Sequence, residues 1–294
     1  MGIMPVDFLY TVPALPEPGE KTNATALIVQ GGGPVPNTLV GLSRLGMTTA
    51  MIAAVGHDWA GDFSIDELKR EKVANDWVIR KKKPSATAVG LIESGSGRRT
   101  IALHRDLFIT PGDLRLSSLP SAQVVHIDGR DLPACIKLAR WGRRVGAQVS
   151  LDVGSIRNDV SALFPLVDQL VVADAFALPF TGSRSARAAL QALAKICRGT
   201  IVITEGTRGA VGHESGQTCR QRAFQVAAVD TTGAGDSFHA GYLFGLLSGF
   251  SLPERLLWGC ATAALKCTRP GARTGAPTRA AVRKFLKNSP RMYA

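Results

Sequence analysis

Residues 230–238 have the sequence Asp230-Thr231-Thr232-Gly233-Ala234-Gly235-Asp236-Ser237-Phe238, and they follow an apolar, strand-like segment at 223–229. A glycine-containing turn that leads from a strand into a helix leaves several backbone N–H groups unpaired at the helix start. Together with the positive end of the helix dipole, these groups bind phosphate oxygens. The stretch therefore predicts a phosphate-binding loop at a strand-to-helix junction.

Asp236 falls in the first turn of the helix that this loop opens. A carboxylate there would lie beside a bound γ-phosphoryl group and could accept a proton from an attacking hydroxyl, so Asp236 is the candidate general base. The alternative is that the glycines form an ordinary turn and Asp236 caps the helix. The P-loop motif G-x-x-x-x-G-K-[ST] does not occur, which argues against a P-loop NTPase. The glycine spacing also differs from the dinucleotide fingerprint, which argues against a dinucleotide-binding protein.

Outward from this loop, short runs rich in β-branched residues alternate with helical patterns, which predicts βαβ units around a doubly wound parallel sheet. Other segments with strand-like alternation predict a small separate sheet that acts as a lid. We expect one domain, residues 1–294, with its lid formed by about residues 10–33 and 78–105. The predicted core strands are 49–55, 123–127, 147–152, 169–172 and 200–204, and the predicted helices are 37–45, 58–69, 132–144, 186–197, 236–248, 253–266 and 278–287.

The composition limits the partners and the location of the protein. Its 294 residues carry a net charge of +12, a field that attracts anions such as nucleotides and sugar phosphates. The basic runs at 81–83, 98–99 and 140–144 are not interleaved with aromatic residues, so we expect solvated faces and no nucleic-acid partner. The sequence has no apolar run long enough to span a membrane, no signal peptide and no C-x-x-C pair, which predicts a cytoplasmic protein without a membrane partner.

The stretch 230–238 resembles the signature of the ribokinase-like (pfkB) carbohydrate kinases, and the resemblance spans nearly the whole chain. It implies a Rossmann-like, three-layer α/β core with a small β lid, ATP as phosphoryl donor, and magnesium. It also implies that Asp236 is the base and that Gly233, Ala234 and Gly235 stabilise the transferring phosphoryl group. A homodimer joined through the lid is a further expectation.

A second motif of the family appears at 31–37, Gly31-Gly32-Gly33-Pro34-Val35-Pro36-Asn37. By the resemblance, Gly32 and Gly33 let the backbone approach a sugar, while the Asn37 amide bonds a hydroxyl. Taken alone, the same residues are typical of a turn and a helix cap. Residues 2–7 resemble the end of the family's first strand, where the acid at Asp7 accepts hydrogen bonds from two sugar hydroxyls. The rest of that strand is missing, so we expect a weakened central sheet.

Three weaker similarities concern the nucleotide and the cations. The segment 204–209 resembles the family's nucleotide loop, which implies nucleotide contacts at Thr204, Gly206 and Gly209, with Thr232 nearby in the phosphate loop. The segment 271–277 resembles a loop that, with carbonyls near Asp230, holds a monovalent cation, which makes potassium a candidate. At 173–176 this chain has Ala-Asp-Ala-Phe where many relatives have Asn-x-x-Glu, so Asp174 is the remaining candidate for magnesium; its alternative role is a helix cap.

Within the family the sequence is most similar to sulfofructose kinases and next to ketohexokinase. The resemblance assigns a sulfonate contact to Arg130 and a further contact to Lys21, although Leu103 stands where an asparagine of that site is expected. Alternatively, Arg130 only pairs with Asp128 or Asp131. We therefore expect an ATP-dependent kinase of a ketose-like, highly polar or anionic sugar. A ribokinase or nucleoside kinase of the same fold, and a non-catalytic sugar or nucleotide sensor, are the alternatives.

Overall fold

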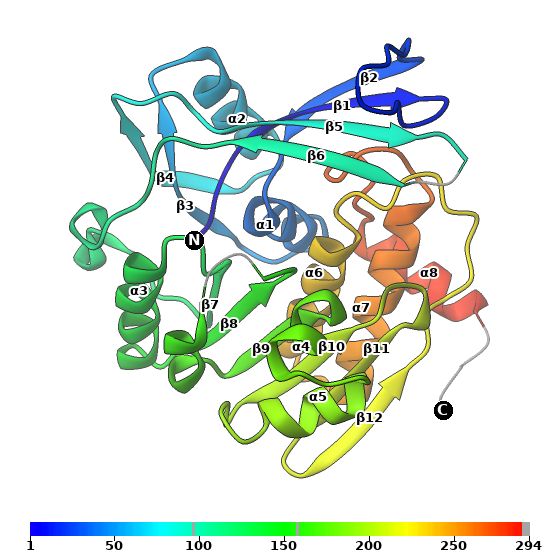
Figure 1. The fold of residues 1–294 in the computed structure, drawn as a ribbon. Coiled ribbons are helices and arrows are strands. Elements are labelled where there is room, and N and C mark those ends of the chain that lie inside the picture. Colours follow the sequence, from blue (N-terminus) through cyan, green and yellow to red (C-terminus); the bar gives the residue numbers. More distant parts are fainter. Residues whose placement is uncertain (96–97, 157–158, 290–294) are drawn as a thin grey trace.

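The central element of the fold is a six-stranded sheet in the order β12-β11-β10-β9-β8-β7. The computed structural model describes residues 1–95, 98–156 and 159–289, and within them the strands form sheets of six, four and two strands. β7 to β10 run parallel, as predicted, and an antiparallel hairpin, β11–β12, extends one edge (Figure 1). The strands are β7 (Val124–Ile127), β8 (Gln148–Val153), β9 (Gln169–Ala173), β10 (Thr200–Thr204), β11 (Ala210–Glu214) and β12 (Gln217–Gln221).

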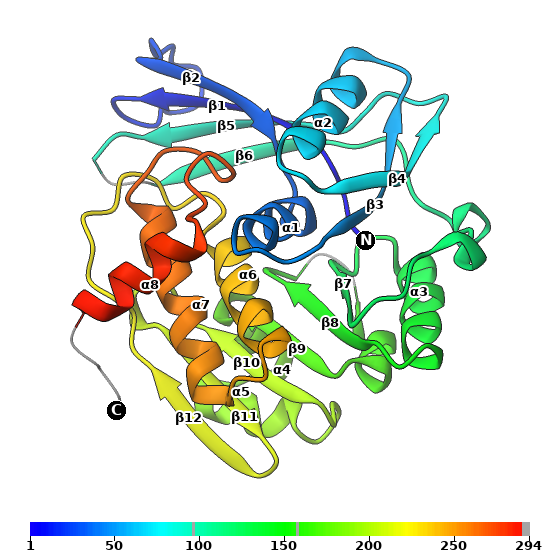
Figure 2. The same cartoon turned by 180° about the vertical axis from the view of Figure 1, so that it is seen from behind.

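Helices cover both faces of this sheet. On one face lie α3, α4 and α5, and on the other lie α1, α6, α7 and α8 (Figures 1 and 2). α6 is buried along most of its length because α1 and α7 pack against it. The arrangement confirms the Rossmann-like, three-layer α/β core. The helices are α1 (Pro34–Arg44), α3 (Leu132–Arg144), α4 (Asp174–Thr181), α5 (Ala186–Leu193), α6 (Ala234–Leu247), α7 (Leu252–Cys267) and α8 (Arg279–Asn288).

The amino-terminal residues join two parts of the core. β3 (Ala50–Gly56) pairs in parallel with β4 (Ala74–Lys81), and α2 (Trp59–Arg70) connects them. The Met1 amino group donates to the His126 carbonyl over 2.6 Å, and the Gly2 N–H donates to the Ile52 carbonyl over 3.3 Å. Residues 1–3 thus lie between β3 and β7.

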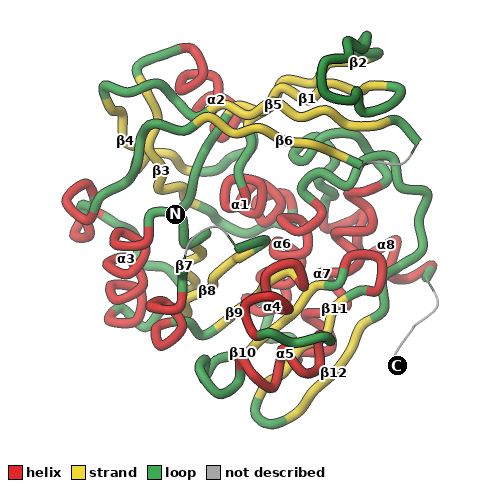
Figure 3. The backbone as a smooth tube through the Cα atoms, in the orientation of Figure 1, coloured by secondary structure: helices red, strands yellow, loops and turns green. Residues whose placement is uncertain are grey.

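The small sheet has the order β2-β1-β5-β6 and lies across one end of the core (Figures 1 and 3). Two details of its prediction are wrong. Residues 78–80 belong to β4 in the core, and residues 6–9 belong to the small sheet. Period-two alternation shows that a segment is a strand but not which sheet it joins. The strands are β1 (Val6–Val12), β2 (Ala26–Gly31), β5 (Thr87–Glu93) and β6 (Arg99–His104).

Other differences lie at turns and element ends. The segment 223–229 is not a strand; it is a connection whose end is held by the Cys267 carbonyl, which accepts from the Val229 and Asp230 N–H groups. α1 begins three residues before the predicted start because Pro34 suits a first helical turn. α4 was not predicted, since it is short and contains Pro179. Short 3-10 helices lie at Pro111–Asp113, Leu116–Ser118, Ser161–Leu166 and Gly206–Arg208.

In the part of the chain that the structure describes, none of the helices combines the length and the apolar character that crossing a membrane requires.

Candidate active site

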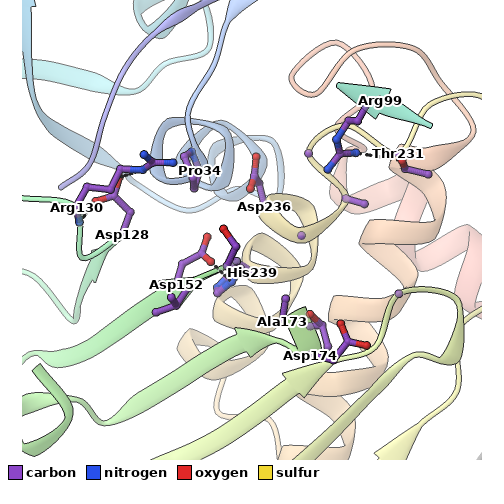
Figure 4. Close-up of a pocket in the computed structure, with 18 of the residues that line it drawn as sticks. Pro34, Arg99, Asp128, Arg130, Asp152, Ala173, Asp174, Thr231, Asp236 and His239 are labelled. Carbon is purple, nitrogen blue, oxygen red and sulfur yellow. Dashed lines mark hydrogen bonds and ion pairs between the residues drawn. The ribbon is translucent and has the colours of Figure 1, made fainter. Parts of the chain in front are cut away.

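A pocket of about 440 Å³ opens at the carboxyl ends of β7 to β10, beside the start of α6 (Figure 4). Because the ends of parallel strands meet at one edge of a sheet, the loops that follow these four strands converge there. Eight of the residues predicted from the sequence line it: Arg130, Asp174, Thr204, Gly206, Gly233, Ala234, Gly235 and Asp236. Residues to which the sequence assigned no catalytic or ligand-binding role also line it, among them Arg99, Asp128, Asp152 and His239.

The start of α6 provides a cradle for an anion. Gly233 adopts a φ of 73°, and a Cβ there would come within 2.6 Å of the Ala272 Cβ, so only glycine fits without strain. A Cβ at Gly235 would meet no atom within 4 Å, which shows open space over the first turn. No side chain of the described residues caps the helix, and the Ala234 N–H donates to the Thr231 carbonyl over 3.1 Å, so the other N–H groups of this turn are the ones that can bind a ligand.

Asp236 lies at the base of this cradle, and its Oδ2 accepts a hydrogen bond of 2.7 Å from the Asn37 amide. Burial raises the pKa of Asp236 to about 7, and the nearby Asp152 carboxylate adds to that increase, while the Asn37 hydrogen bond opposes it. A carboxyl group with this pKa exchanges a proton near neutral pH, as a general base requires.

Buried Arg273 fixes the orientation of Asn37. Its Nε donates to Asn37 Oδ1 over 3.0 Å, which leaves the Asn37 amide nitrogen facing Asp236. The same guanidinium donates to the Gly32 carbonyl over 3.0 Å and to Glu67 over 3.0 Å. Arg273 was not predicted, because its role depends on three segments that are distant in sequence.

Asp7 is buried in β1, next to the glycine turn. A Cβ at Gly32 would lie 2.2 Å from both Asp7 carboxylate oxygens, so the Gly32 backbone lies directly against that carboxylate. Burial raises the pKa of Asp7 to about 7, with Arg273 opposing and Glu67 adding to the increase. Asp7 lies against Gly32, Arg273 joins Gly32 to Asn37, and Asn37 contacts Asp236, but Asp7, Gly32, Gly33 and Asn37 do not line the 440 Å³ pocket.

Arg130 reaches the pocket from the loop after β7, and Figure 4 shows its guanidinium extending toward Pro34. Its Nε lies 4.0 Å from Asp128 Oδ2, and its backbone N–H donates to Asp128 Oδ1 over 3.1 Å. Asp131 instead accepts two hydrogen bonds of 2.6 Å from Arg105. Of the two partners considered for Arg130, the structure therefore gives it Asp128.

Asp152 and His239 form a buried pair in the pocket wall, with 3.2 Å between Asp152 Oδ1 and His239 Nε2 (Figure 4). Burial alone would raise the pKa of Asp152, but His239 holds it below its usual value. The His126 ring lies 5.2 Å from the His239 ring, and burial lowers the pKa of His126 to about 3. Asp152 thus remains ionised close to Asp236.

The opposite side of the pocket contains the predicted nucleotide residues Thr204 and Gly206. Gly209 does not line the pocket. It has a φ of 98°, and a Cβ there would come within 2.1 Å of the Gln221 carbonyl, so the glycine is required by packing. Buried Thr232 lies in the turn before α6, where its N–H donates to Asp230 Oδ1 over 2.7 Å.

Asp174, at the start of α4, is the predicted residue best placed for magnesium. Its carboxylate faces the pocket and pairs with Arg208 over 2.8 Å. Magnesium takes oxygen ligands and is commonly held by one or two carboxylates, water and substrate phosphates. An acid that lines the same pocket as the start of α6 fits that donor set.

Asp230 is less suited to a free monovalent cation. Its carbonyl oxygen already accepts a hydrogen bond of 2.6 Å from the Lys266 ammonium, and its carboxylate lies 3.7 Å from the same group. Lys21 lies in the exposed connection between β1 and β2 and does not line the pocket.

The position of a residue near a strand end was the signal that could have identified Asp152, since it is the second-last residue of β8 and Ala173 is the last of β9. Arg99 was predicted to lie on a solvated face, but it lines the pocket and donates to Thr231 Oγ1 over 3.1 Å. No sequence signal identifies Arg99, because β6 and the start of α6 are distant in the sequence and are brought together only by the tertiary fold.

Known proteins that resemble this chain match it over nearly its whole length. Residues 1–279 match the pfkB family of carbohydrate kinases. The chain is 25% identical to a ribokinase of Haemophilus influenzae, covering 98% of each chain, and 25% identical to mouse ketohexokinase, covering 92% of this chain and 96% of that protein. The structure of Arabidopsis thaliana ribokinase complexed with ribose and ATP is similar, with a TM-score of 0.83, 25% identity, and coverage of 98% and 97%.

A match that covers residues 1–279, on a fold with this anion cradle and buried acid, establishes the family of sugar kinases. The chain belongs to the pfkB family of carbohydrate kinases.

Proposed function

We propose that this sugar kinase transfers the γ-phosphoryl group of ATP to a hydroxyl of an anionic, ketose-like sugar. One observation carries the proposal: Asp236, the uncapped start of α6 and Arg130 all open into the same pocket. The first two serve phosphoryl transfer. Arg130 adds a planar, cationic group that suits a phosphate, sulfonate or carboxylate at the far end of the sugar.

In the reaction, a sugar hydroxyl donates its proton to the Asp236 carboxylate while its oxygen attacks the γ-phosphorus. The bond from the γ-phosphorus to the bridging oxygen breaks, and ADP leaves with that electron pair. The Asn37 amide orients the Asp236 carboxylate through their 2.7 Å hydrogen bond. The backbone turn formed by Gly233, Ala234 and Gly235 stabilises the charge on the transferring group through N–H groups that the turn itself does not use.

For the nucleotide, the proposal assigns contacts to Thr204, Gly206, Gly209 and Thr232. Thr204 and Gly206 line the pocket on the side of β10, while Gly209 shapes the loop between β10 and β11. Bound magnesium would be held through Asp174, directly or through water, and would neutralise charge on the β- and γ-phosphate oxygens.

For the sugar, the proposal assigns hydroxyl contacts to Asp7, Gly32, Gly33 and Asn37; the contact of Asn37 with Asp236 and that of Gly32 with Asp7 support it. The small sheet serves as a lid over the pocket, and Lys21 adds a positive charge from the connection between β1 and β2. An acid accepts from two hydroxyls at once, which suits Asp7 to a sugar diol.

Kinetics of Arg130→Ala test the anionic part of the proposal. Loss of a charge-assisted contact should lower kcat/KM for phosphorylated, sulfonated or carboxylated ketoses about tenfold to a hundredfold, and should barely change it for neutral ketoses. Arg140→Ala, which removes an exposed arginine of α3, is the matched control. Equal losses on charged and neutral sugars would assign Arg130 a structural role only.

An ADP-release assay of the wild-type protein against ketoses, ribose and nucleosides separates the alternatives. Turnover only with ribose or a nucleoside would show that the substrate is one of these and not a ketose. The absence of ADP release with every sugar, despite nucleotide binding in calorimetry, would support a sensor and contradict a catalytic role.

A further inference from the structure

Lys266, in the last turn of α7, is a fully buried lysine that the proposed mechanism does not use. Its ammonium donates to the Asp230 carbonyl oxygen over 2.6 Å and lies 3.7 Å from Asp230 Oδ2. Burial lowers its pKa, while the Asp230 charge opposes that change. A charge buried this deeply is costly unless it is paired and hydrogen-bonded, so its contacts need an explanation.

The ammonium lies where two loops meet behind the anion cradle. Asp230 Oδ1 accepts from the Thr232 N–H over 2.7 Å, and Asp230 Oδ2 accepts from the Gly271 N–H over 2.7 Å. A Cβ at Gly275 would lie 3.1 Å from Lys266 Cε, which places the lysine against the segment 271–275. Lys266 therefore joins the loop that opens α6 to the loop that follows α7.

The same two loops determine the shape of the cradle. Ala272 packs against Gly233, where a Cβ would come within 2.6 Å of it, so a shift of the segment 271–275 moves the first turn of α6. The Asp236 carboxylate also contributes to the field at Lys266. A positive charge at this point favours negative charge developing over the cradle.

We propose that the Lys266 ammonium is a built-in monovalent cation: it occupies the position between the Asp230 carbonyl and the segment 271–275, so the enzyme needs no potassium. An ammonium group is a compact point charge, comparable with a monovalent ion that has lost its water shell. Lys266 supplies it covalently, without the entropy of capturing an ion from solution. The inference rests on the proposed function of the cradle.

The wild-type protein gives the first test. Initial rates of ADP release are measured at constant ionic strength with tetramethylammonium, sodium, potassium or ammonium chloride. The expected result is the same rate in all four salts. Saturable activation by potassium would overturn the proposal.

Lys266→Met gives the second test, because it removes the charge and leaves space for a small ion. Loss of this charge-assisted contact should lower turnover about tenfold to a hundredfold in tetramethylammonium. Potassium or ammonium should restore part of the rate in a saturable way. A Lys266→Met enzyme with wild-type turnover, or one that no small cation activates, would contradict the proposal.

The melting temperature provides a readout that does not depend on turnover. Potassium should raise that of Lys266→Met by about 2–4 °C over tetramethylammonium, since an ion that binds only the folded state stabilises it. The matched control is Lys137→Met, because Lys137 also donates to a backbone carbonyl, that of Pro111 at 2.5 Å, but lies away from the cradle. The control should show no potassium response.

These measurements distinguish the two proposals. If no sugar is phosphorylated but potassium selectively stabilises Lys266→Met, the site is correct and the proposed function fails. If sugars are phosphorylated and the variant shows no cation response in either assay, the inference alone fails. Where Lys266→Met does not fold, Lys266→Gln takes its place, and the wild-type salt series still decides.

Discussion

The floor of the pocket and the small sheet above it differ in how their polar groups are held. On the floor, Asp236 is bonded to Asn37 and Asp152 is paired with His239; Asn37, Asp152 and His239 are buried, and Asp236 is half-buried. The small sheet is open: every residue of β6 is exposed, and its Arg99 reaches the pocket from the edge of the sheet. Groups held in fixed positions suit the phosphoryl-transfer step, whereas an exposed sheet suits closure over the pocket. Changes to the floor should therefore affect turnover most.

Removal of magnesium should have the largest effect, because the floor provides acids but the phosphate charges need a divalent cation. Excess EDTA should abolish ADP release, and added magnesium should restore it. The rate is measured with saturating ATP and sugar, with calcium addition as the control for chelation itself. Full activity in excess chelator would contradict the assignment of a magnesium site at Asp174.

Asp236→Asn should lower kcat by about 10² to 10⁴, the range expected for loss of a positioned general base. Nucleotide affinity, measured by calorimetry, should stay nearly unchanged, because the cradle is formed by backbone groups. Asp66→Asn, which alters an exposed carboxylate of α2, is the control. Wild-type turnover in Asp236→Asn would exclude Asp236 as the base.

The pH dependence of kcat/KM tests how the acids of the pocket floor influence one another. Asp236 must be ionised to accept a proton and its pKa is about 7, so kcat/KM should fall about tenfold per pH unit below 7. Asp152, His239 and Arg99 are the charged or titratable groups that influence it. Asp152→Asn removes the like charge that adds to the increase, so the acid limb should move about 0.5–1 unit lower. If the acid limb of the pH profile does not move in Asp152→Asn, a group other than Asp152 determines its position.

Arg99→Ala tests the contribution of the small sheet. It removes the hydrogen bond to Thr231 Oγ1 and the positive charge that the sheet places over the pocket. We expect kcat/KM to fall about tenfold, near the lower limit for a charge-assisted contact. Arg98→Ala is the neighbouring control, since Arg98 pairs with Glu93 on the same sheet. Equal effects of the two variants would remove the special role of Arg99.

The smallest effect on activity is expected on the outer face of the small sheet. Val89 and Leu27 are 45% and 50% exposed, and the register places them beside Phe8 and Tyr10 on one face. Such a patch is typical of an interface, and we expect a homodimer there. Val89→Lys should shift sedimentation from dimer to monomer with kcat retained, whereas Val145→Lys on α3's end should not. A wild-type monomer would contradict the dimer.

Local pattern was sufficient for the core. The strands β7 to β10 are apolar runs bounded by turns, and α3 has the predicted limits because its apolar spacing and following glycine are local signals. Pattern identified 78–80 as a strand but not the sheet that it joins, and it failed at 223–229, because strand-like alternation does not depend on whether, or where, a pairing partner is present. It also missed α4, where Pro179 opposes a helix that tertiary packing stabilises.

For the site, the sequence alone determined the residues whose role depends on a contiguous motif. The start of α6, its glycines and Asp236 lie within one turn of one another, so their chemistry follows from adjacency in the chain. Only the tertiary structure decided which distant groups complete them: Arg99 from β6, Asp152 from β8, Arg273 behind Asn37 and Lys266 behind Asp230. The reason is that a pKa or a hydrogen bond depends on distance in space, which a linear pattern does not encode.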